Sequence, residues 1–452
     1  MELAPRFNIV TGDNGLGKSF LLDVIWWVLT RTWPQQVNSG MGTGYMAEPR
    51  DPTETASITA WVREPERGAA FEVTYKPSEE AWIPASSEGT IEVRPDQSVD
   101  PFHVDFKEPF ATNLVVYAHA DGSFSSWDPL RHGPPRQDGR PQRRPALVLT
   151  PDEVYNGSSV KERGKTVHLC NGLISDWVKW SAARNRDHDR MMAVLNAVAE
   201  EAFLGPVQVG EPTRISLSDS RDIPTIITRY AGPVPILHAS AGVRRVASLA
   251  YMLALTWREH RLAARRLGRD ACEGIVLLVD EIESHLHPRW QRMILHSLPI
   301  AVDAVSELGV QLDMQVVVTT HSPLVMSAAE RFFDENKDRW FDLALAKGPD
   351  SGGQPDFVEL RSPPFERLGT VGHWLARDDA FGLPTDRGNT HAEAMILKAR
   401  ELLVRDIAEL EPDDVESLNE ELVRELEVND PFLARWGYFV DDVRRRRRTE
   451  RK

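Results

Sequence analysis

Three short apolar runs along the chain each end abruptly in polar residues. They occupy residues 7–10, 275–279 and 316–318. Five consecutive aliphatic residues in the second run are typical of a strand that is buried on both faces of a parallel sheet. Helical patterns follow the first run, at residues 20–29, and the third run, where Ser322 and Pro323 suit a helix start. The pattern therefore predicts an α/β fold around a parallel sheet.

The remaining elements are expected in smaller groups. Residues 56–62 and 70–75 indicate an antiparallel subsheet beside the first strand–helix unit. Residues 171–203 form the strongest helical candidate of the following stretch, and the lack of sustained heptads there excludes a long coiled-coil arm. Strands are expected again at 340–346 and 356–360, and acidic amphipathic helices at 401–430. An aromatic segment at 429–439 would either complete the core of that last region or dock a partner.

A glycine-rich segment joins the first strand to its helix. It reads Gly12, Asp13, Asn14, Gly15, Leu16, Gly17, Lys18 and Ser19, which fits the pattern G-x-x-x-x-G-K-S. Glycines allow successive backbone N–H groups to turn toward an anion at a helix N-terminus. We expect Lys18 to reach the β- and γ-phosphates of ATP, and Ser19 to bind Mg²⁺. The other residues expected to bind the nucleotide here are Gly12, Asn14, Gly15 and Gly17.

Two acidic residues, Asp280 and Glu281, follow the five aliphatic residues of the central strand. Adjacent carboxylates are costly to place at the end of a buried strand. We expect Asp280 to hold Mg²⁺ and Glu281 to activate the water that attacks ATP. The alternative is a buried strand that is followed by a capped helix start.

A histidine, His321, follows the third apolar run, in the sequence Thr-Thr-His-Ser-Pro. At the carboxyl end of a strand, its side chain would contact a γ-phosphate or sense its loss. Taken alone, such a histidine is more often structural. We interpret His321 as a catalytic residue because it comes after the phosphate loop and the acidic pair, in this order.

Composition narrows the setting of the chain. Its 452 residues suffice for a large core with two or three subdomains. No stretch of about 18 uncharged apolar residues occurs, so we expect no membrane span. Cys170 and Cys272 are far apart and are expected as buried thiols, which fits a cytoplasmic location. A net charge of −15 argues against a protein that binds nucleic acid over its whole surface.

The order of the three motifs resembles that of the ATP-binding-cassette (ABC) class of ATPases. More closely, it resembles the stand-alone branch that includes RecF, SMC-like and OLD-type ATPases, over roughly residues 5–62 and 235–345. The resemblance implies an α/β P-loop NTPase fold of the ABC-ATPase head type. An antiparallel subsheet, a short helical lobe and a helical C-terminal region would complete it.

The expected parts are four. Residues 1–118 would form the P-loop lobe with the antiparallel subsheet, and residues 119–236 an insertion with the helical lobe. Residues 237–369 would carry the signature segment of the ABC class, which is described below, the acidic pair Asp280 and Glu281, and His321. Residues 370–452 would form an acidic helical region with an arginine-rich tail.

In the ABC class, a signature segment completes the γ-phosphate site of the opposite subunit. The matching residues are Ser240 and Gly242, where a hydroxyl, a backbone N–H and a helix N-terminus would face phosphate. Val243 replaces the usual acidic or polar residue. Arg244 and Arg245 follow, and they would either add to the positive field around phosphate or face solvent. The resemblance implies a homodimer that ATP closes and hydrolysis releases.

The class also has a glutamine loop that touches Mg²⁺, and no glutamine occurs at the matching place in this chain. His119 or Asp121 would substitute for it. The equally weighted alternative is a strand that ends in a polar hairpin turn.

The effector is expected on a separate chain. No Asp-x-Asp pattern follows residue 345, and we find no second carboxylate cluster for cutting a phosphodiester. In size and motif order the chain is similar to the PtuA-type ATPases of Septu anti-phage systems, which work with an HNH nuclease. We therefore expect an ATPase that regulates or assembles with a partner effector, a nuclease by this analogy, in bacterial anti-phage defence.

Two other functions stay open at this point. One is a RecF-like ATPase of DNA repair that binds DNA ends; the other is a transporter subunit, which the missing glutamine loop disfavours. Two segments would contact nucleic acid if they are more than solvated surface. They are the basic loop at 131–144 and the arginine run from Arg444 to Arg448.

Overall fold

The computed structural model contains two compact units, residues 1–367 and 368–452. The ranges that it describes are 1–49, 51, 55–63, 68–84, 90–92, 103–105, 111–133, 144–162, 164–183, 185–203, 207–228, 231–306, 312–346, 357–405 and 410–450. No helix within these ranges is both long enough and apolar enough to cross a bilayer.

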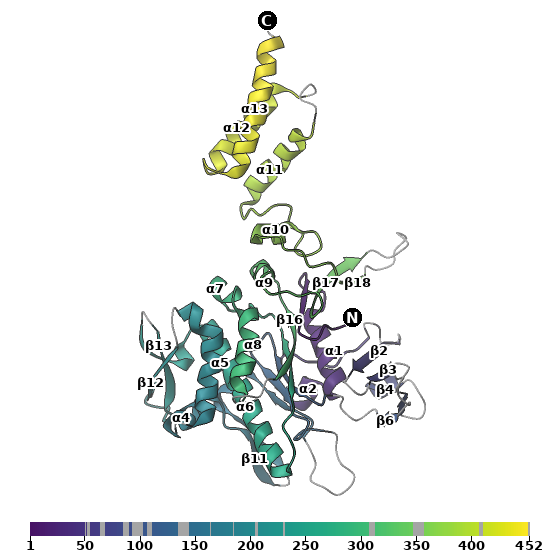
Figure 1. Ribbon diagram of the computed structural model, residues 1–452, viewed down its shortest axis with the longest axis vertical. Coiled ribbons are helices and arrows are strands. Elements are labelled where there is room, and N and C mark those ends of the chain that lie inside the picture. The colour runs from purple at the N-terminus through teal and green to yellow at the C-terminus, as the bar shows by residue number, and fades with distance from the viewer. Residues whose placement is uncertain are drawn as a thin grey trace. The chain divides into compact units, whose positions relative to one another are not determined.

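An eight-stranded sheet organises the first unit (Figure 1). Its strands lie in the order β18 (Phe357–Arg361), β17 (Asp338–Ala346), β1 (Phe7–Gly12), β16 (Asp313–Thr319), β15 (Gly274–Val279), β7 (Leu114–Ala118), β8 (Phe124–Trp127) and β9 (Leu147–Leu149). The five strands from β17 to β7 are parallel, and β18, β8 and β9 pair antiparallel at the two ends. The predicted α/β fold with a parallel core is confirmed.

Helices cover both faces of this sheet. Leu22 and Trp26 of α1 (Lys18–Thr30) share a buried cluster with Val10, Leu278 and Val317 from three neighbouring strands. On the opposite face, side chains of α6 (Ala241–Leu267) and α8 (Ile294–Val305) lie beside Ala118 of β7 and Val279 of β15. Successive side chains of a strand point to opposite faces, so Val279 faces away from the cluster that contains Leu278. The strands are therefore buried on both sides, as their continuous apolar runs require.

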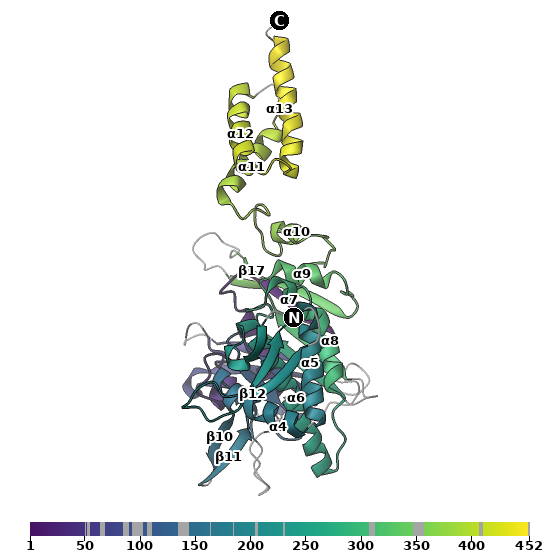
Figure 2. The same cartoon turned by 90° about the vertical axis from the view of Figure 1, so that its left-hand side faces the viewer.

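Smaller sheets surround this core. The predicted antiparallel subsheet is present as β2 (Ser57–Arg63), β3 (Gly68–Lys76) and β4 (Ala81–Pro84), which pack against Trp27 of α1. Figure 2 shows the hairpin of β10 (Ser158–Glu162) and β11 (Lys165–Cys170) projecting from this unit. The others are β5 (Thr90–Glu92) with β6 (His103–Asp105), and β12 (Gln208–Thr213) with β13 (Ile223–Thr228) and β14 (Ala231–Pro235).

The helical segment that we expected at 171–203 is two helices, α4 (Leu173–Ala183) and α5 (Arg186–Phe203). Short helices complete the unit: α2 (Pro34–Val37), η1 (Pro77–Glu79), α3 (Pro151–Asn156), η2 (Ile236–His238), α7 (Pro288–Gln291) and α9 (Pro323–Ala329). The four expected parts of the chain stay a prediction, and β8 and β9 from the second part extend the main sheet.

The second unit is helical. It contains α10 (Val371–Ala376), α11 (Thr390–Leu403), α12 (Pro412–Glu425) and α13 (Pro431–Glu450). Trp436 of the aromatic segment is fully buried in a cluster that the last three helices share, so this residue completes the core. The arginine run continues α13: Arg444 pairs with Glu416 at 2.5 Å, and Arg445 pairs with Asp442 at 3.7 Å. The side chains beyond Arg446 lie outside the described part.

Candidate functional site

The carboxyl ends of four parallel strands meet at one edge of the sheet. Val10 of β1 pairs with Thr319 of β16, and Val279 of β15 pairs with Ala118 of β7. This register places the ends of the three predicted motifs next to one another, with the segment after β7 beside them. The edge is where open α/β sheets commonly bind their ligands.

The glycine loop leaves β1 in a conformation that few residues other than glycine adopt. Gly12 has φ of 136°, and a Cβ at this position would lie 2.5 Å from the carbonyl oxygen of Leu343 in β17. Gly17, with φ of 92°, is the N-cap of α1. Asn14, Gly15 and Ser19 are exposed, so their polar groups lie at the surface beside the helix N-terminus. The loop thus has the shape of an anion-binding turn.

Lys18 lies against this loop and is only 5% exposed. Its Nζ donates hydrogen bonds to the carbonyl oxygens of Gly12, at 2.7 Å, and Asp13, at 2.9 Å. Burial lowers the pKa of the Lys18 ammonium, while the carboxylates of Asp280 and Glu281 raise it. The structure therefore brings the lysine of the first motif within electrostatic reach of the acids of the second.

Thr319 of β16 fixes the two acids. Its Oγ1 donates to Oδ1 of Asp280 at 2.7 Å and accepts from the backbone N–H of Glu281, also at 2.7 Å. Asp280 is 2% exposed, whereas Glu281 is half-buried. Glu281 has φ of 45°, a left-handed conformation that is uncommon outside glycine and clusters at functional sites.

A third acid, Glu283, connects this pair to His321. Its two carboxylate oxygens accept hydrogen bonds from Thr320 Oγ1, at 2.7 Å, and from the backbone N–H of His321. His321 is half-buried. Sequence reasoning missed Glu283, although its spacing three residues after Asp280 was visible. Glu283 thereby holds the backbone at His321 against the loop after β15 that carries Asp280, Glu281 and Glu283, here called the acidic loop.

The predicted signature begins α6. Ser240 is exposed and is the N-cap, and its side chain accepts from the backbone N–H of Val243 at 3.4 Å. Gly242 is buried, and a Cβ there would lie 2.7 Å from the carbonyl oxygen of His285. Glycine is therefore required for α6 to approach the loop after the acidic pair. The hydroxyl of Ser240 and the start of the helix lie at the surface.

The two arginines after the signature differ in environment. Arg244 is exposed, as one of our alternatives had it. Arg245 does not face solvent: it turns inward and donates to backbone carbonyl oxygens, among them that of Asp280 at 2.8 Å. Its contribution to the positive field around phosphate stays a prediction. Sequence reasoning missed that Arg245 also belongs to the framework of the site.

The segment after β7 is a hairpin turn into β8. His119 is 1% exposed and hydrogen-bonded with Ser125 Oγ at 2.8 Å, and burial lowers its pKa to about 3. Asp121 accepts from the backbone and the hydroxyl of Ser123. Nδ1 of His119 also lies 3.3 Å from Thr43 Oγ1, outside the hairpin. The segment has the form of our second alternative, a strand that ends in a polar turn, and the substitution of His119 or Asp121 for the glutamine loop stays a prediction.

Asp23 is a buried acid on α1, one turn after Ser19. Tyr117 Oη donates to its Oδ1 at 3.0 Å. Burial raises the pKa of Asp23 to about 7, the hydrogen bond from Tyr117 lowers it, and the charge of Asp280 raises it. The side chain is therefore half-protonated near neutral pH.

Asp23→Asn is expected to flatten the dependence of stability on pH. The folded-state pKa of about 7 exceeds the ordinary value of 3.8, so the folded protein holds a proton that the unfolded chain releases. The contribution of Asp23 to the free energy of unfolding is then full below about pH 4 and is lost as pH rises through about 7. The whole shift corresponds to at most about 4 kcal/mol.

The melting temperature of the variant should rise relative to wild type between pH 5 and 8, without nucleotide. Asp303→Asn, at an exposed position of α8, is the control, and parallel curves for Asp23→Asn and wild type would contradict the assignment.

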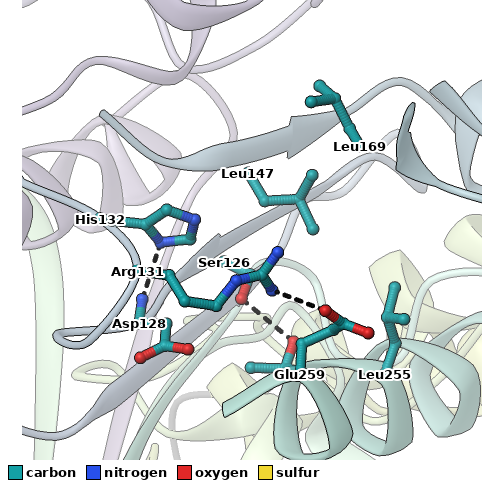
Figure 3. Close-up of a pocket in the computed structure, with 9 residues that line it drawn as sticks. Ser126, Asp128, Arg131, His132, Leu147, Leu169, Leu255 and Glu259 are labelled. Carbon is teal, nitrogen blue, oxygen red and sulfur yellow. Dashed lines mark hydrogen bonds and ion pairs between the residues drawn. The ribbon is translucent and has the colours of Figure 1, made fainter. Parts of the chain in front are cut away.

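A pocket lies elsewhere, between α6 and the antiparallel end of the sheet (Figure 3). Ser126 Oγ and Thr256 Oγ1 are hydrogen-bonded across it at 3.0 Å, and Arg131 pairs with Glu259 at 3.5 Å. The polar groups around this pocket bind one another and join helix to sheet. Residues 134–143 of the expected basic loop, which begins here, lie outside the described residues.

The residues at the sheet edge fit a magnesium nucleotide. Mg²⁺ takes oxygen ligands and commonly uses one or two protein groups together with phosphate oxygens and water. The donor set of Ser19 Oγ and the Asp280 carboxylate matches that chemistry. The N-terminus of α1 and the Lys18 ammonium match the charge of the phosphates.

Several solved structures share a weak likeness with the chain. The Smc head bound to the C-winged helix domain of ScpA has 14% identity and a TM-score of 0.33, over 81% of this chain and 93% of that one. The recombination mediator protein RecF-ATPrS has 12% identity and a TM-score of 0.30, over 76% and 91%. At such TM-scores these likenesses carry no argument about this chain.

A family model gives the stronger comparison. The model described as "AAA domain, putative AbiEii toxin, Type IV TA system" matches residues 7–327. The match includes the glycine loop, the signature segment, the acidic pair and His321, and it spans well over half of the 452 residues. The chain therefore belongs to this AAA-domain family.

Proposed function

We propose that the chain is a dimeric ABC-type ATPase that binds and hydrolyses ATP with Mg²⁺ and controls a separate effector, a nuclease, in bacterial anti-phage defence. The observation that carries the ATPase part is the convergence at one sheet edge of Lys18, of Asp280 with Glu281, and of the His321 segment. Membership of an AAA-domain family supports the same activity. The similarity to PtuA-type ATPases remains a proposal.

Each residue has a role that follows from its place. Lys18 and the N-terminus of α1 neutralise charge on the β- and γ-phosphates. Bound Mg²⁺, held by Ser19 and Asp280, would stabilise charge that develops on phosphate oxygens. Glu281 accepts a proton from the attacking water. The oxygen of this water bonds to the γ-phosphorus, and the bond between the γ-phosphorus and the β,γ-bridging oxygen breaks. His321 contacts the γ-phosphate.

The homodimer is proposed from the start of α6. An α-helix leaves its first N–H groups without partners inside the helix, and a helix N-terminus attracts anions. Ser240 lies at such an end, at the surface, on a helix of 27 residues. We propose that this end and Ser240 face the γ-phosphate that the partner subunit binds, and that ATP thereby holds the dimer together.

A protein partner is favoured over nucleic acid as the regulated target. The net charge is −15, and Arg444 and Arg445 of the arginine run already pair with Glu416 and Asp442. Association with polyanionic nucleic acid depends on cations that are available to phosphate. The family description names a putative toxin and a type IV toxin–antitoxin system, which supports a setting in which a harmful activity is produced and controlled.

The purified chain alone is expected to hydrolyse ATP slowly and to leave plasmid, linear and single-stranded DNA and tRNA uncut. Its proposed metal ligands suit a phosphoanhydride, whereas cutting a phosphodiester needs a partner's site. Co-purification from the native operon, followed by mass measurement and cleavage assays with and without ATP, tests this. Lys18→Ala is the control.

Each alternative gives a different result in the same assays. Metal-dependent cleavage by the lone chain that survives Lys18→Ala would overturn the separate effector. Strong stimulation of ATP hydrolysis by DNA ends, with no partner present, would instead favour the RecF-like function.

A further inference from the structure

We propose that Arg245 is a positioning residue that ties the start of α6 to the backbone bearing Asp280 and Glu281. In this arrangement, Glu281 keeps its hydrolytic geometry only while the signature end of α6 is in place. The inference rests on the proposed ATPase function and adds a residue and a coupling to it.

The guanidinium of Arg245 is bound to four backbone carbonyl oxygens from two segments. Nη1 donates to Ala120 at 2.9 Å and to His119 at 3.3 Å, and Nη2 donates to Asp280 at 2.8 Å and to Glu281 at 3.3 Å. The planar fork of arginine suits several acceptors at once, which a lysine ammonium matches poorly. One side chain of α6 thereby joins the end of β7 to the end of β15.

The bond to Glu281 acts on a backbone that needs support. At φ of 45°, Glu281 is in a conformation that persists only when its surroundings hold it. Thr319 Oγ1 binds its N–H at 2.7 Å on one side, and Arg245 binds its carbonyl oxygen on the other. The backbone N–H of Ser284 also donates to this carbonyl oxygen, at 2.8 Å, so loss of Arg245 removes one of three hydrogen bonds to the Glu281 backbone. The direction of the Glu281 carboxylate then becomes less defined.

The charge of Arg245 also belongs to the site. Burial lowers its pKa, while the carboxylates of Asp280, Glu281, Glu283 and Asp121 raise it, and an arginine stays protonated in either case. Together with Lys18, it sets positive charge among the acids of the acidic loop. A neutral replacement removes both the carbonyl contacts and this balance.

The other end of the connection is the predicted signature. Arg245 lies three residues after Gly242, which packs against the carbonyl oxygen of His285, and five after the N-cap Ser240. A shift of this helix start therefore moves the guanidinium that holds Glu281. By this connection, phosphate bound at the start of α6 favours the hydrolytic geometry of the same chain's acidic pair.

A packing role alone makes a different prediction. Arg245 lies beside apolar side chains that include Val246 and Leu249. If its aliphatic stem only filled space, methionine would replace it without loss of turnover. The positioning role requires the guanidinium itself.

The test compares Arg245→Met and Arg245→Lys with wild type in steady-state ATP hydrolysis and in equilibrium binding of ATP. We expect Arg245→Met to lower kcat at least about tenfold, with the KM and Kd for ATP within about threefold of wild type. Arg245→Lys should recover part of kcat, since its ammonium keeps the charge but reaches fewer carbonyls. Arg258→Met is the control on the same helix, because Arg258 pairs with Asp187 and Glu259 side chains, and it should keep the wild-type kcat.

The outcomes separate this inference from the proposed function. A kcat of Arg245→Met within twofold of wild type, or a loss confined to ATP affinity, would overturn the positioning role while ATPase activity stands. A wild-type chain that neither binds nor hydrolyses ATP would overturn both. If Arg245→Met fails to fold, Arg245→Lys decides alone: a lowered kcat with unchanged Kd supports the role, and wild-type kcat overturns it.

Discussion

Glu281→Gln is expected to lower ATP turnover by about 10²-fold or more, the usual effect of removing a positioned general base. ATP affinity should stay near wild type, because glutamine has nearly the same size and because the proposed phosphate contacts come from Lys18 and the glycine loop. The backbone contacts of residue 281 involve only its N–H and carbonyl oxygen, so they do not depend on the carboxylate. The variant should therefore stay folded and trap bound ATP.

The same variant should also accumulate as an ATP-dependent dimer, since bound nucleotide is no longer consumed. Sedimentation or mass measurement with ATP, with ADP and without nucleotide reads this directly. Glu273→Gln, an exposed acid just before β15, is the matched control and should turn over ATP like wild type. Hydrolysis by Glu281→Gln at the wild-type rate would show that another group activates the water.

The site was predicted from the continuous apolar runs and from the polar residues that follow them, a pattern that is typical of strands in a parallel sheet. A continuous apolar run has to be buried on both faces, and its first polar residues must then lie at the sheet edge. Because parallel neighbours end at the same edge, Lys18, Asp280 and His321 could be expected near one another before any coordinates. The register of β1, β16 and β15 fulfils that expectation. The roles of these residues remain a prediction.

Arg245 shows what local patterns leave out, and where a signal was available. Its acceptors lie 35 and 36 residues later in the chain and 125 and 126 residues earlier, which no local pattern specifies. Helical periodicity did carry information: Arg245 is three residues after Gly242 and four before Leu249, both buried, whereas Arg244 is on another face. The two arginines could have been assigned different faces from this spacing.

The break between α4 and α5 is a similar case. Asn185 Oδ1 accepts from the backbone N–H groups of Asp187 and His188, as a helix N-cap does. An asparagine within an otherwise helical segment was the available signal. In the second unit, by contrast, the pairing of Arg444 with Glu416 joins residues 28 apart on two helices, and it depends on packing that the arginine run itself does not encode.

The largest loss of binding is expected from Lys18→Ala. Its ammonium lies within the curve of the glycine loop, where it would face the β- and γ-phosphates, and alanine removes this buried positive charge. ATP affinity should fall by about 10²-fold or more, as for the loss of a charged hydrogen bond in a desolvated site. Equilibrium binding of ATP measures it. Lys179→Ala, on α4, is the control, and wild-type affinity in Lys18→Ala would contradict the phosphate site.

Lys18→Ala also tests the composite site when it is mixed with a chain that is defective only in the signature. Ser240→Arg suits that purpose better than a change at Gly242, because Ser240 is exposed, whereas any side chain at position 242 would press on the His285 carbonyl. Each variant alone should be inactive. In a mixed dimer, the intact Lys18 of one chain and the intact Ser240 of the other form one complete site. An equal mixture should thus recover up to roughly a quarter of the wild-type activity, since random pairing gives half mixed dimers with one of two sites intact. Full inactivity of proven mixed dimers would mean that the sites are not shared across the dimer or that both must be intact for either to hydrolyse.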